Sequence, residues 1–270
     1  MGLCWVLRKT LAPKPRADVV DIPTNLHKMS ENVYCHGGDL GDTIYSLPAI
    51  MATGGGHLVL WQKPYVRDPY SPEKVSRIAT FFASQPYIKS VQFKTHENPT
   101  HNLDDFRAVW LALRRKNQHV HYNLAELHLL SQGLPLHHAA EKWLDIEPET
   151  VPMRPVLFNR TFRYLGQRFP WKAVWEKYRN WAAFMGTRNE WQAFQGHFGN
   201  ISYIETTHLL DAARYIAGCK IFVGNQSALM AIAIGLQVPT ILQETWPIEQ
   251  NCLFPCVTSI LTENVVLPDL

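Results

Sequence analysis

The stretch Val33–Ala49 reads VYCHGGDLGDTIYSLPA and decides the fold that we expect. It opens with an apolar run typical of a buried strand, turns through glycines and aspartates, and continues into a helical pattern. A strand, a tight polar turn and a helix start form the unit from which parallel sheets are built. The free backbone N–H groups and the positive dipole end of a helix start suit an anion.

A second stretch of the same kind lies far along the chain, at Lys220–Gly235, and reads KIFVGNQSALMAIAIG. It also indicates a buried strand, a polar turn and a helix, here one of small apolar residues that can pack closely on its sheet. Two such turns, one in each half of the chain, predict a cleft. We expect a phosphorylated ligand on one side of this cleft and a reacting partner on the other.

Strand patterns alternate with helical patterns around both stretches, which predicts parallel pairing and an α/β fold of two doubly wound sheets. The proline-rich stretch Asp145–Pro155 separates the halves. We therefore expect an N-terminal arm over residues 1–32 and two Rossmann-like domains, over residues 33–150 and 151–270. Ligands bind such sheets at the carboxyl ends of the strands, where both stretches turn.

The expected elements follow from these patterns. The strands are expected at 33–35, 57–61, 88–93, 155–158, 181–185, 201–204, 220–223 and 239–242. The helices are expected at 42–51, 72–84, 103–116, 123–133, 138–144, 171–180, 189–197, 209–218 and 227–235.

Composition indicates an ordinary globular protein, since 46% of the residues are hydrophobic and 18% are charged. A net charge of +3 permits contact with nucleic acid without arguing for it. The five cysteines are an odd number without zinc-site spacing, so we expect reduced thiols and a cytoplasmic protein. No stretch approaches the length of a membrane span or of a signal peptide.

The polar residues of the first turn have two possible roles. Gly38 and Gly41 let the chain turn sharply and let a ligand approach the backbone around Asp39. Asp42 would face that ligand, or it would only cap a helix starting at Thr43. The spacing is neither the dinucleotide fingerprint nor a P-loop.

The second turn has the same two interpretations. Asn225 or Ser227 would cap the following helix. Alternatively, the backbone N–H groups of Gln226, Ser227 and Ala228 would hold a pyrophosphate.

Two further groups in the second half are candidates for a phosphorylated ligand. The turn Phe184–Glu190 carries Gly186 and Thr187, and Glu190 would accept hydrogen bonds from ribose hydroxyls or merely suit the helix dipole. Arginine matches phosphate geometry bidentately, and candidates at 160, 163 and 168 follow the first strand of this half; a solvated loop is the alternative. The histidine pairs at 119/121 and 137/138 lack the spacing of a metalloprotease site, so we expect no metal.

Taken together, the pattern G-D-x-G-D-x-x-x-x-L-P-A at Gly38–Ala49 and the late N-Q-S turn resemble the heptosyltransferase-type glycosyltransferases, family nine. The resemblance covers residues 33–243. It implies a GT-B fold, in which two Rossmann-like domains face a central cleft and bind the acceptor and a nucleotide-diphosphate sugar. Asn225 and Met230 stand where the family commonly has a carboxylate and a histidine.

The resemblance also implies an activity and its residues. It implies an inverting glycosyltransferase with Asp42 as catalytic base, and a diphosphate held by Gln226–Ala228 with Arg163 or Arg168. The donor sugar or nucleoside would be contacted by Gly186, Thr187, Glu190 and Asn225. The sequence has no D-x-D motif, which is consistent with a mechanism without a metal. The acceptor would be a saccharide or a hydroxymethylated base in DNA. A non-catalytic nucleotide-sugar-binding module and a nucleotide-sugar epimerase are the alternatives.

Overall fold

The computed structural model describes residues 31–63, 66, 68–95, 98–166, 168–244, 251–260 and 266–270. Residues 31–270 form one compact unit. The expected N-terminal arm therefore lies outside the described residues, apart from Glu31 and Asn32. The division of the larger unit into two domains near residue 150 stays a prediction.

The first half of this unit is built on a parallel sheet with the strand order β3-β2-β1-β4. Its strands are β1 (Val33–His36), β2 (Gly56–Trp61), β3 (Ile88–Lys94) and β4 (His101–Asn102). Its helices are α1 (Leu40–Tyr45), α2 (Leu47–Ala52), α3 (Pro72–Ala83), α4 (Phe106–Arg115) and α5 (Leu124–Ser131), with short 3₁₀ turns η1 (Leu103–Asp105), η2 (His119–His121) and η3 (Leu136–Ala140). The strand order reverses between β1 and β4, so the first motif leaves the sheet at a switch point.

The second half carries a parallel sheet with the order β10-β9-β8-β5-β6-β7. Its strands are β5 (Val156–Asn159), β6 (Ala182–Met185), β7 (Ser202–Ile204), β8 (Ile221–Asn225), β9 (Thr240–Glu244) and β10 (Thr258–Ile260). Its helices are α6 (Trp171–Tyr178), η4 (Arg179–Trp181), α7 (Arg188–Phe198), α8 (Leu209–Gly218) and α9 (Ala228–Leu236). Counted within this half, the order is 3-2-1-4-5-6, that of a Rossmann sheet.

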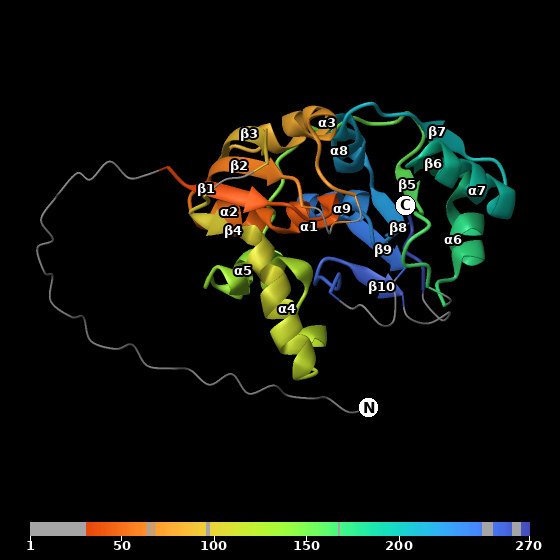
Figure 1. The fold of residues 1–270 in the computed structure, drawn as a ribbon. Helices are drawn as coiled ribbons and strands as arrows, with labels where there is room; N and C mark the ends of the chain where they lie inside the picture. Colours follow the sequence, from red (N-terminus) through yellow and green to blue (C-terminus); the bar gives the residue numbers. More distant parts are fainter. Residues whose placement is uncertain are drawn as a thin grey trace, which may run out of the picture. The chain divides into compact units, whose positions relative to one another are not determined.

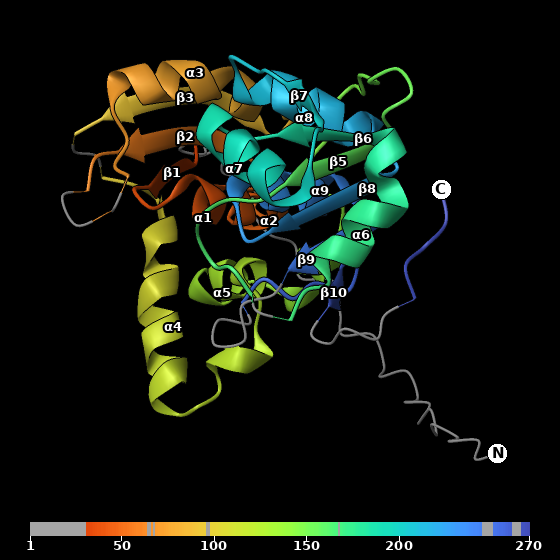
Figure 2. The ribbon, with the colours of Figure 1, turned by 90° about the vertical axis from the view of Figure 1, so that its right-hand side faces the viewer.

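The two sheets are joined by packed helices and one continuous core. Helix α1 packs on α9, and α3 packs on α8 (Figure 1). Ile44 of α1 and Ile232 of α9 are both fully buried in that core. A second, aromatic core around Phe158 lies between the other face of the second sheet and helices α6 and α7 (Figure 2). The expected fold class, two doubly wound Rossmann-like α/β sheets, is confirmed.

Several predicted elements differ from the structure. The single helix expected at 42–51 is two helices that meet at Ser46, because Pro48 at the start of α2 has no N–H to continue the first. The helix expected at 138–144 is only the turn η3. The N–H groups of Trp143 and Leu144 instead bond to the Gly235 carbonyl oxygen at 3.2 and 3.1 Å. Strands β4 and β10, of two and three residues, were not predicted.

No helix among the described residues combines the length and the apolar character needed to cross a membrane.

Candidate active site

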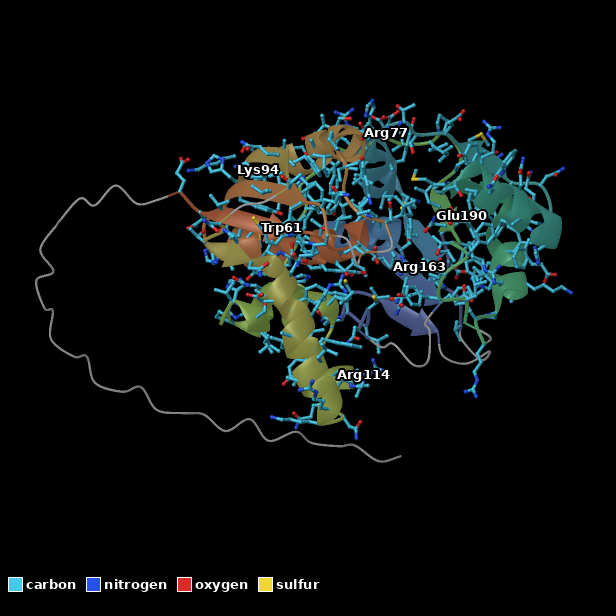
Figure 3. The ribbon with its side chains drawn as sticks, viewed as in Figure 1. Trp61, Arg77, Lys94, Arg114, Arg163 and Glu190 are labelled. Atoms are coloured by element: carbon cyan, nitrogen blue, oxygen red, sulfur yellow. The ribbon has the colours of Figure 1, made fainter. Side chains whose placement is uncertain are left out.

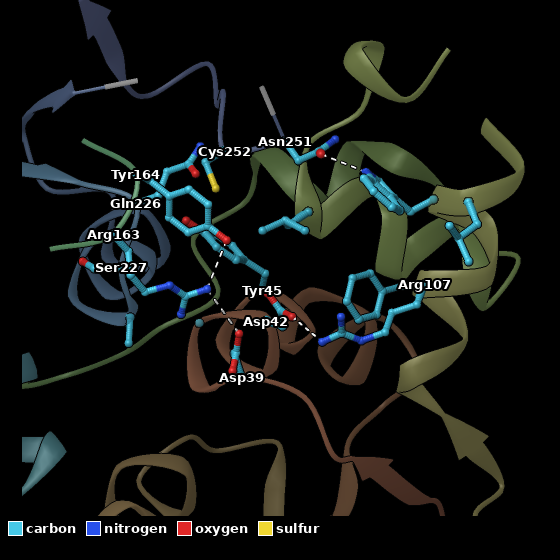
Figure 4. Close-up of a pocket in the computed structure, with 16 residues that line it drawn as sticks. Asp39, Asp42, Tyr45, Arg107, Arg163, Tyr164, Gln226, Ser227, Asn251 and Cys252 are labelled. Carbon is cyan, nitrogen blue, oxygen red and sulfur yellow. Dashed lines mark hydrogen bonds and ion pairs between the residues drawn. The ribbon is translucent and has the colours of Figure 1, made fainter. Parts of the chain in front are cut away.

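A pocket of about 430 Å³ lies where the carboxyl ends of both sheets meet (Figure 4). The first half contributes the turn and helix at 39–45, the pocket side of α4, and Leu124. The second half contributes Arg163, Tyr164 and the turn Gln226–Ala228, and the later segment at 251–252 closes one side. The cleft that we expected between the two motifs therefore exists.

The two motifs touch each other at this pocket. A Cβ added to Gly41 would lie 3.8 Å from the backbone N and Cα of Ala228, so the starts of α1 and α9 are in close contact. Ser227 is the N-cap of α9, since its hydroxyl accepts from the Met230 N–H at 3.1 Å. The same hydroxyl donates to Asn159 Oδ1 at 2.8 Å, which fixes the turn to the end of β5.

Asp42 faces the pocket and is not a helix cap. Helix α1 starts at Leu40 rather than Thr43, and its N-cap is Asp39, so the capping role considered for Asp42 is wrong. Its Oδ2 accepts from Arg107 Nη2 of α4 at 2.8 Å, and 21% of the side chain is exposed. Burial raises the pKa of the Asp42 carboxyl to about 6, against the opposing effect of Arg107. A carboxyl with this pKa can accept a proton near neutral pH.

A second ion pair crosses the pocket between the two halves. Arg163 Nη2 lies 3.5 Å from Asp39 Oδ2. The same guanidinium donates to the Tyr164 hydroxyl at 3.1 Å and lies over the Tyr164 ring. Arg163 is therefore held at the pocket by partners from both halves.

A buried polar group supports the first turn from below. Asp104 accepts from the Gly37 N–H at 3.0 Å and from Trp61 Nε1 at 2.8 Å, and it pairs with Lys63 Nζ at 2.7 Å. His36 Nδ1 accepts from the Gly38 N–H at 2.9 Å. Burial lowers the pKa of His36 to about 4, so the ring is neutral at neutral pH. Because Nδ1 accepts a hydrogen bond, the proton of the neutral ring is on Nε2.

Gly38 is required by this arrangement, because a Cβ there would lie 2.6 Å from His36 Cε1. Gly38 shapes the turn without lining the pocket.

Asn225 is committed to the protein itself. It is fully buried, its Nδ2 donates to the carbonyl oxygens of Thr161 and Arg163, and its Oδ1 accepts from the Thr161 N–H at 2.9 Å. The amide thus holds the loop that carries Arg163. It does not line the pocket.

The remaining candidates of the second half lie outside the pocket. Glu190 Oε2 accepts from the Thr187 N–H and hydroxyl, both at 2.8 Å, in a capping box at the start of α7. Gly186 lies beside Asn159, whose Nδ2 donates to the Met185 carbonyl oxygen at 2.8 Å. Arg168 is exposed and does not line the pocket.

The structure thus divides the candidates into two sets. Asp39, Gly41, Asp42, Arg163, Gln226, Ser227 and Ala228 share one pocket, whereas Gly38, Arg168, Gly186, Thr187, Glu190 and Asn225 are not among its lining residues. Sequence reasoning missed Arg107, Asp104 and Asn159. Asn159 directly follows the strand predicted at 155–158, so a search of strand ends would have found it. Asp104 and Arg107 lie within the helix predicted at 103–116, but the two-residue strand β4 that brings them to the first turn has no sequence pattern.

One group of the described residues has metal-ligand spacing. The ligand atoms of His137, His138 and Glu141 lie within 4.8 Å of one another at η3. None of the three lines the pocket. The aspartates of the pocket, Asp39 and Asp42, are each paired with an arginine.

The solved structures that are similar to this chain include several glycosyltransferases. A glycosyl transferase family 9 protein from Veillonella parvula has a TM-score of 0.49 at 12% identity and covers 85% of each chain. E. coli heptosyltransferase WaaC, with ADP-2-deoxy-2-fluoro heptose, gives 0.47 at 12% identity, over 84% of this chain and 92% of that one. E. coli ADP-heptose LPS heptosyltransferase II gives 0.48 at 13% identity, over 86% and 90%.

An iron-containing dodecameric glycosyltransferase, TibC of E. coli, gives 0.48 at 12% identity, over 84% of this chain and 62% of that one. No protein-family model and no curated protein matches the sequence.

Proposed function

We propose that this protein is an inverting glycosyltransferase that moves a sugar from a nucleotide-diphosphate sugar to an acceptor hydroxyl. The observation that carries the proposal is the position of Asp42. This carboxyl, with its raised pKa, lines a pocket that is also lined by the start of α9 and by Arg163 from the second half. A glycosyl transfer needs a base for the acceptor hydroxyl and a site for the diphosphate leaving group. Asp42 and the anion-binding start of α9 supply these two groups.

The reaction follows from these two sides. The acceptor oxygen attacks the anomeric carbon, and Asp42 takes the proton of the acceptor hydroxyl. The bond between the anomeric carbon and the diphosphate oxygen breaks, and its electron pair leaves with the diphosphate. Attack opposite the leaving group inverts the anomeric centre.

The diphosphate would be held by the side of the pocket that belongs to the second half. The backbone at Gln226, Ser227 and Ala228 opens α9, whose dipole favours a negative charge. Arg163 would exchange its ion pair with Asp39 for the diphosphate, which it matches bidentately. Stabilising the leaving group in this way needs no metal.

The nucleoside would lie along the carboxyl edge of the second sheet. The turn that carries Gly186, Thr187 and Glu190 borders Asn159, and Asn159 bonds directly to Ser227. We keep these three residues as donor contacts and Arg168 as a second phosphate contact. Asn225 would act indirectly, by holding the Arg163 loop. The acceptor is a saccharide or a hydroxymethylated base in DNA.

The test is Asp42→Asn, assayed by single-turnover transfer and by slow hydrolysis of the donor. Removing a general base lowers the chemical step by about a hundredfold or more, while donor binding is retained. Binding is followed by thermal shift, since a ligand at a hundred times its dissociation constant adds about 2.7 kcal/mol to the stability. Full turnover in the variant would reject Asp42 as the base.

Asp39→Asn is the matched control, because it removes a carboxylate of the same pocket that pairs with Arg163 instead of Arg107. We expect it to change donor KM more than kcat. Donor binding without any hydrolysis or transfer would favour the non-catalytic binding module. Conversion of the free donor without an acceptor would favour an epimerase.

A further inference from the structure

We propose that the acceptor is a DNA strand whose backbone lies on the basic end of α4 while one base presents its hydroxyl to Asp42. This inference rests on the proposed glycosyl transfer and specifies its substrate class. Two independent features support it: the apolar wall of the pocket on the acceptor side, and the exposed cations that continue that wall.

The acceptor side of the pocket is mostly aromatic and aliphatic. The first half lines it with Tyr45, Phe106, Trp110, Leu111 and Leu124. Its charged residues are Asp39, Asp42 and Arg107, all three already in ion pairs. A saccharide would bring several hydroxyl groups that need hydrogen-bond partners, and this wall offers few. A nucleobase brings a flat face that packs on apolar and aromatic side chains.

Helix α4 carries the same wall away from the pocket. Arg107, Trp110, Leu111 and Arg114 recur at the spacing of one helix face, and the first three line the pocket. Arg114 lies about 10 Å further along the axis than Arg107, because each residue rises about 1.5 Å. Figure 3 shows Arg114 near the far end of α4.

The far end of α4 carries three exposed cations. Arg114 lies over the Trp110 ring at 4.8 Å, and Trp110 Nε1 donates to Asn251 Oδ1 at 3.0 Å. Arg115 and Lys116 follow directly and are exposed. None of the three cations pairs with an acidic side chain in the described part of the chain. The sequence from Phe106 to Ala125 contains no aspartate or glutamate. We define the basic ridge as Arg114, Arg115 and Lys116.

A polyanion is the ligand that complements this ridge. Phosphates of a nucleic-acid backbone would contact it while the neighbouring nucleotide enters the pocket. An anionic membrane fits less well, because a membrane-binding helix needs a broad exposed apolar face. The apolar side of α4 packs on α5, and the large exposed hydrophobic side chains of residues 106–121 are only Leu111 and Val120.

The pocket also determines how the base must arrive. Asp42 lines a concave pocket and only 21% of its side chain is exposed, so a base inside a duplex cannot reach it without leaving the stack. In the transfer, the hydroxyl group of the base is the nucleophile. Its oxygen bonds to the anomeric carbon, its proton goes to Asp42, and the nucleoside diphosphate leaves.

The test measures DNA binding without donor, by fluorescence anisotropy of an unmodified oligonucleotide as single strand and as duplex, between 50 and 200 mM NaCl. The variant is Arg114→Ala/Arg115→Ala/Lys116→Ala. If the ridge contacts three phosphates, the slope of log K against log salt falls by about 2 to 3 and affinity falls by tenfold or more. The control Lys172→Ala/Arg179→Ala/Arg214→Ala removes three exposed cations of the second half and should leave both quantities unchanged.

Transfer is then read by mass spectrometry of nucleosides digested from an oligonucleotide containing 5-hydroxymethylcytosine or 5-hydroxymethyluracil. A gain of one glycosyl unit that needs both the ridge and Asp42 is the expected result. Equal loss in both triple variants, no DNA binding, or binding only to phosphatidylglycerol vesicles would overturn the inference. Donor binding and donor hydrolysis are measured separately, so their survival would leave the proposed function standing while the DNA acceptor falls.

Discussion

At the scale of residues, Asp42 experiences two opposing influences. Burial raises the pKa of its carboxyl to about 6, and the Arg107 guanidinium 2.8 Å away works against that rise. The base form therefore dominates only above about pH 6. Both the proposed chemistry and the stability of the protein should depend on this one titration.

The first prediction is a pH profile. If Asp42 must be unprotonated to accept the proton, kcat/KM should rise with pH and level off above about pH 6. Arg107→Gln removes the main group that lowers this pKa, so its acid limb should move to higher pH. Rates measured in buffers of constant ionic strength check both profiles, and identical limbs in the two proteins would contradict the assignment.

The second prediction concerns the stability of Asp42→Asn. The ordinary pKa of 3.8 is raised in the folded state, so the folded protein binds the proton more tightly and loses stability as pH rises from about 4 to 6. Asparagine is neutral throughout and avoids this penalty. Above pH 6 the variant should gain up to about 3 kcal/mol, since one pKa unit is about 1.4 kcal/mol.

Loss of the Arg107 ion pair reduces this gain. Near pH 4 the stabilities of the two proteins should converge. Denaturant melts at several pH values measure the difference, which must grow with pH for the assignment to stand.

The sequence predicted the position of Asp42 at a cleft more readily than the residues that surround it. The turn and its glycines form a local pattern, which is why Asp39, Gly41 and Asp42 could be placed at a cleft. Arg107 and Asp104 come from a segment more than 60 positions away, and only tertiary folding brings them beneath and beside the turn. Asn225 is the opposite case. Its position at a strand end suggested a ligand contact, but its side chain bonds to the loop that carries Arg163.

At the scale of elements, glycines distinguish local from tertiary requirements. Gly218 is the last residue of α8, and glycine commonly ends a helix because it adopts the left-handed conformation. Its backbone is not left-handed, and the real reason is a close approach, since a Cβ would overlap the Glu149 carbonyl oxygen. The same tertiary effect explains why the helix expected at 138–144 does not form, because its N–H groups pair with the end of α9. Contacts of this kind between distant segments produce no periodic pattern in the sequence.

The third prediction compares two helical glycines. Gly218→Ala should destabilise the protein by about 1–3 kcal/mol, because the backbone carbonyl of Glu149 must move. Gly196→Ala, on the exposed face of α7 with nothing within 4 Å of the added Cβ, should stabilise it by about 0.5–1 kcal/mol. Urea titrations of both variants give the comparison. A neutral or stabilising Gly218→Ala would contradict the close approach.

At the scale of the whole chain, the segment after β9 returns to the first half. Phe254 stacks on the Tyr45 ring with 5.3 Å between centroids. Asn251 bonds to three parts of the acceptor side: its Nδ2 donates to the carbonyl oxygens of His119 and Tyr122, and its Oδ1 accepts from Trp110. The sequence predicted two sheets and a cleft, because hydrophobic periodicity is local. It gave no sign of this return, which depends on single side chains.

The last prediction tests whether this return holds the acceptor wall in place. Asn251→Ala leaves two carbonyl oxygens and one indole N–H without their partner, which should cost about 2–4 kcal/mol in the free energy of unfolding. Hydrogen exchange should accelerate most in α4, η2 and the start of α5, because these are the segments that Asn251 joins. Asn189→Ala, at an exposed position of α7, is the control and should stay within about 0.5 kcal/mol of the parent.

The segments in which hydrogen exchange accelerates decide whether Asn251 holds the acceptor wall in place. Trp110 supports Arg114, so loosening α4 should also weaken DNA binding, while donor binding at the second half stays intact. A variant that loses stability evenly, without faster exchange in residues 106–124, would show that the returning segment stabilises the fold as a whole and does not hold the wall.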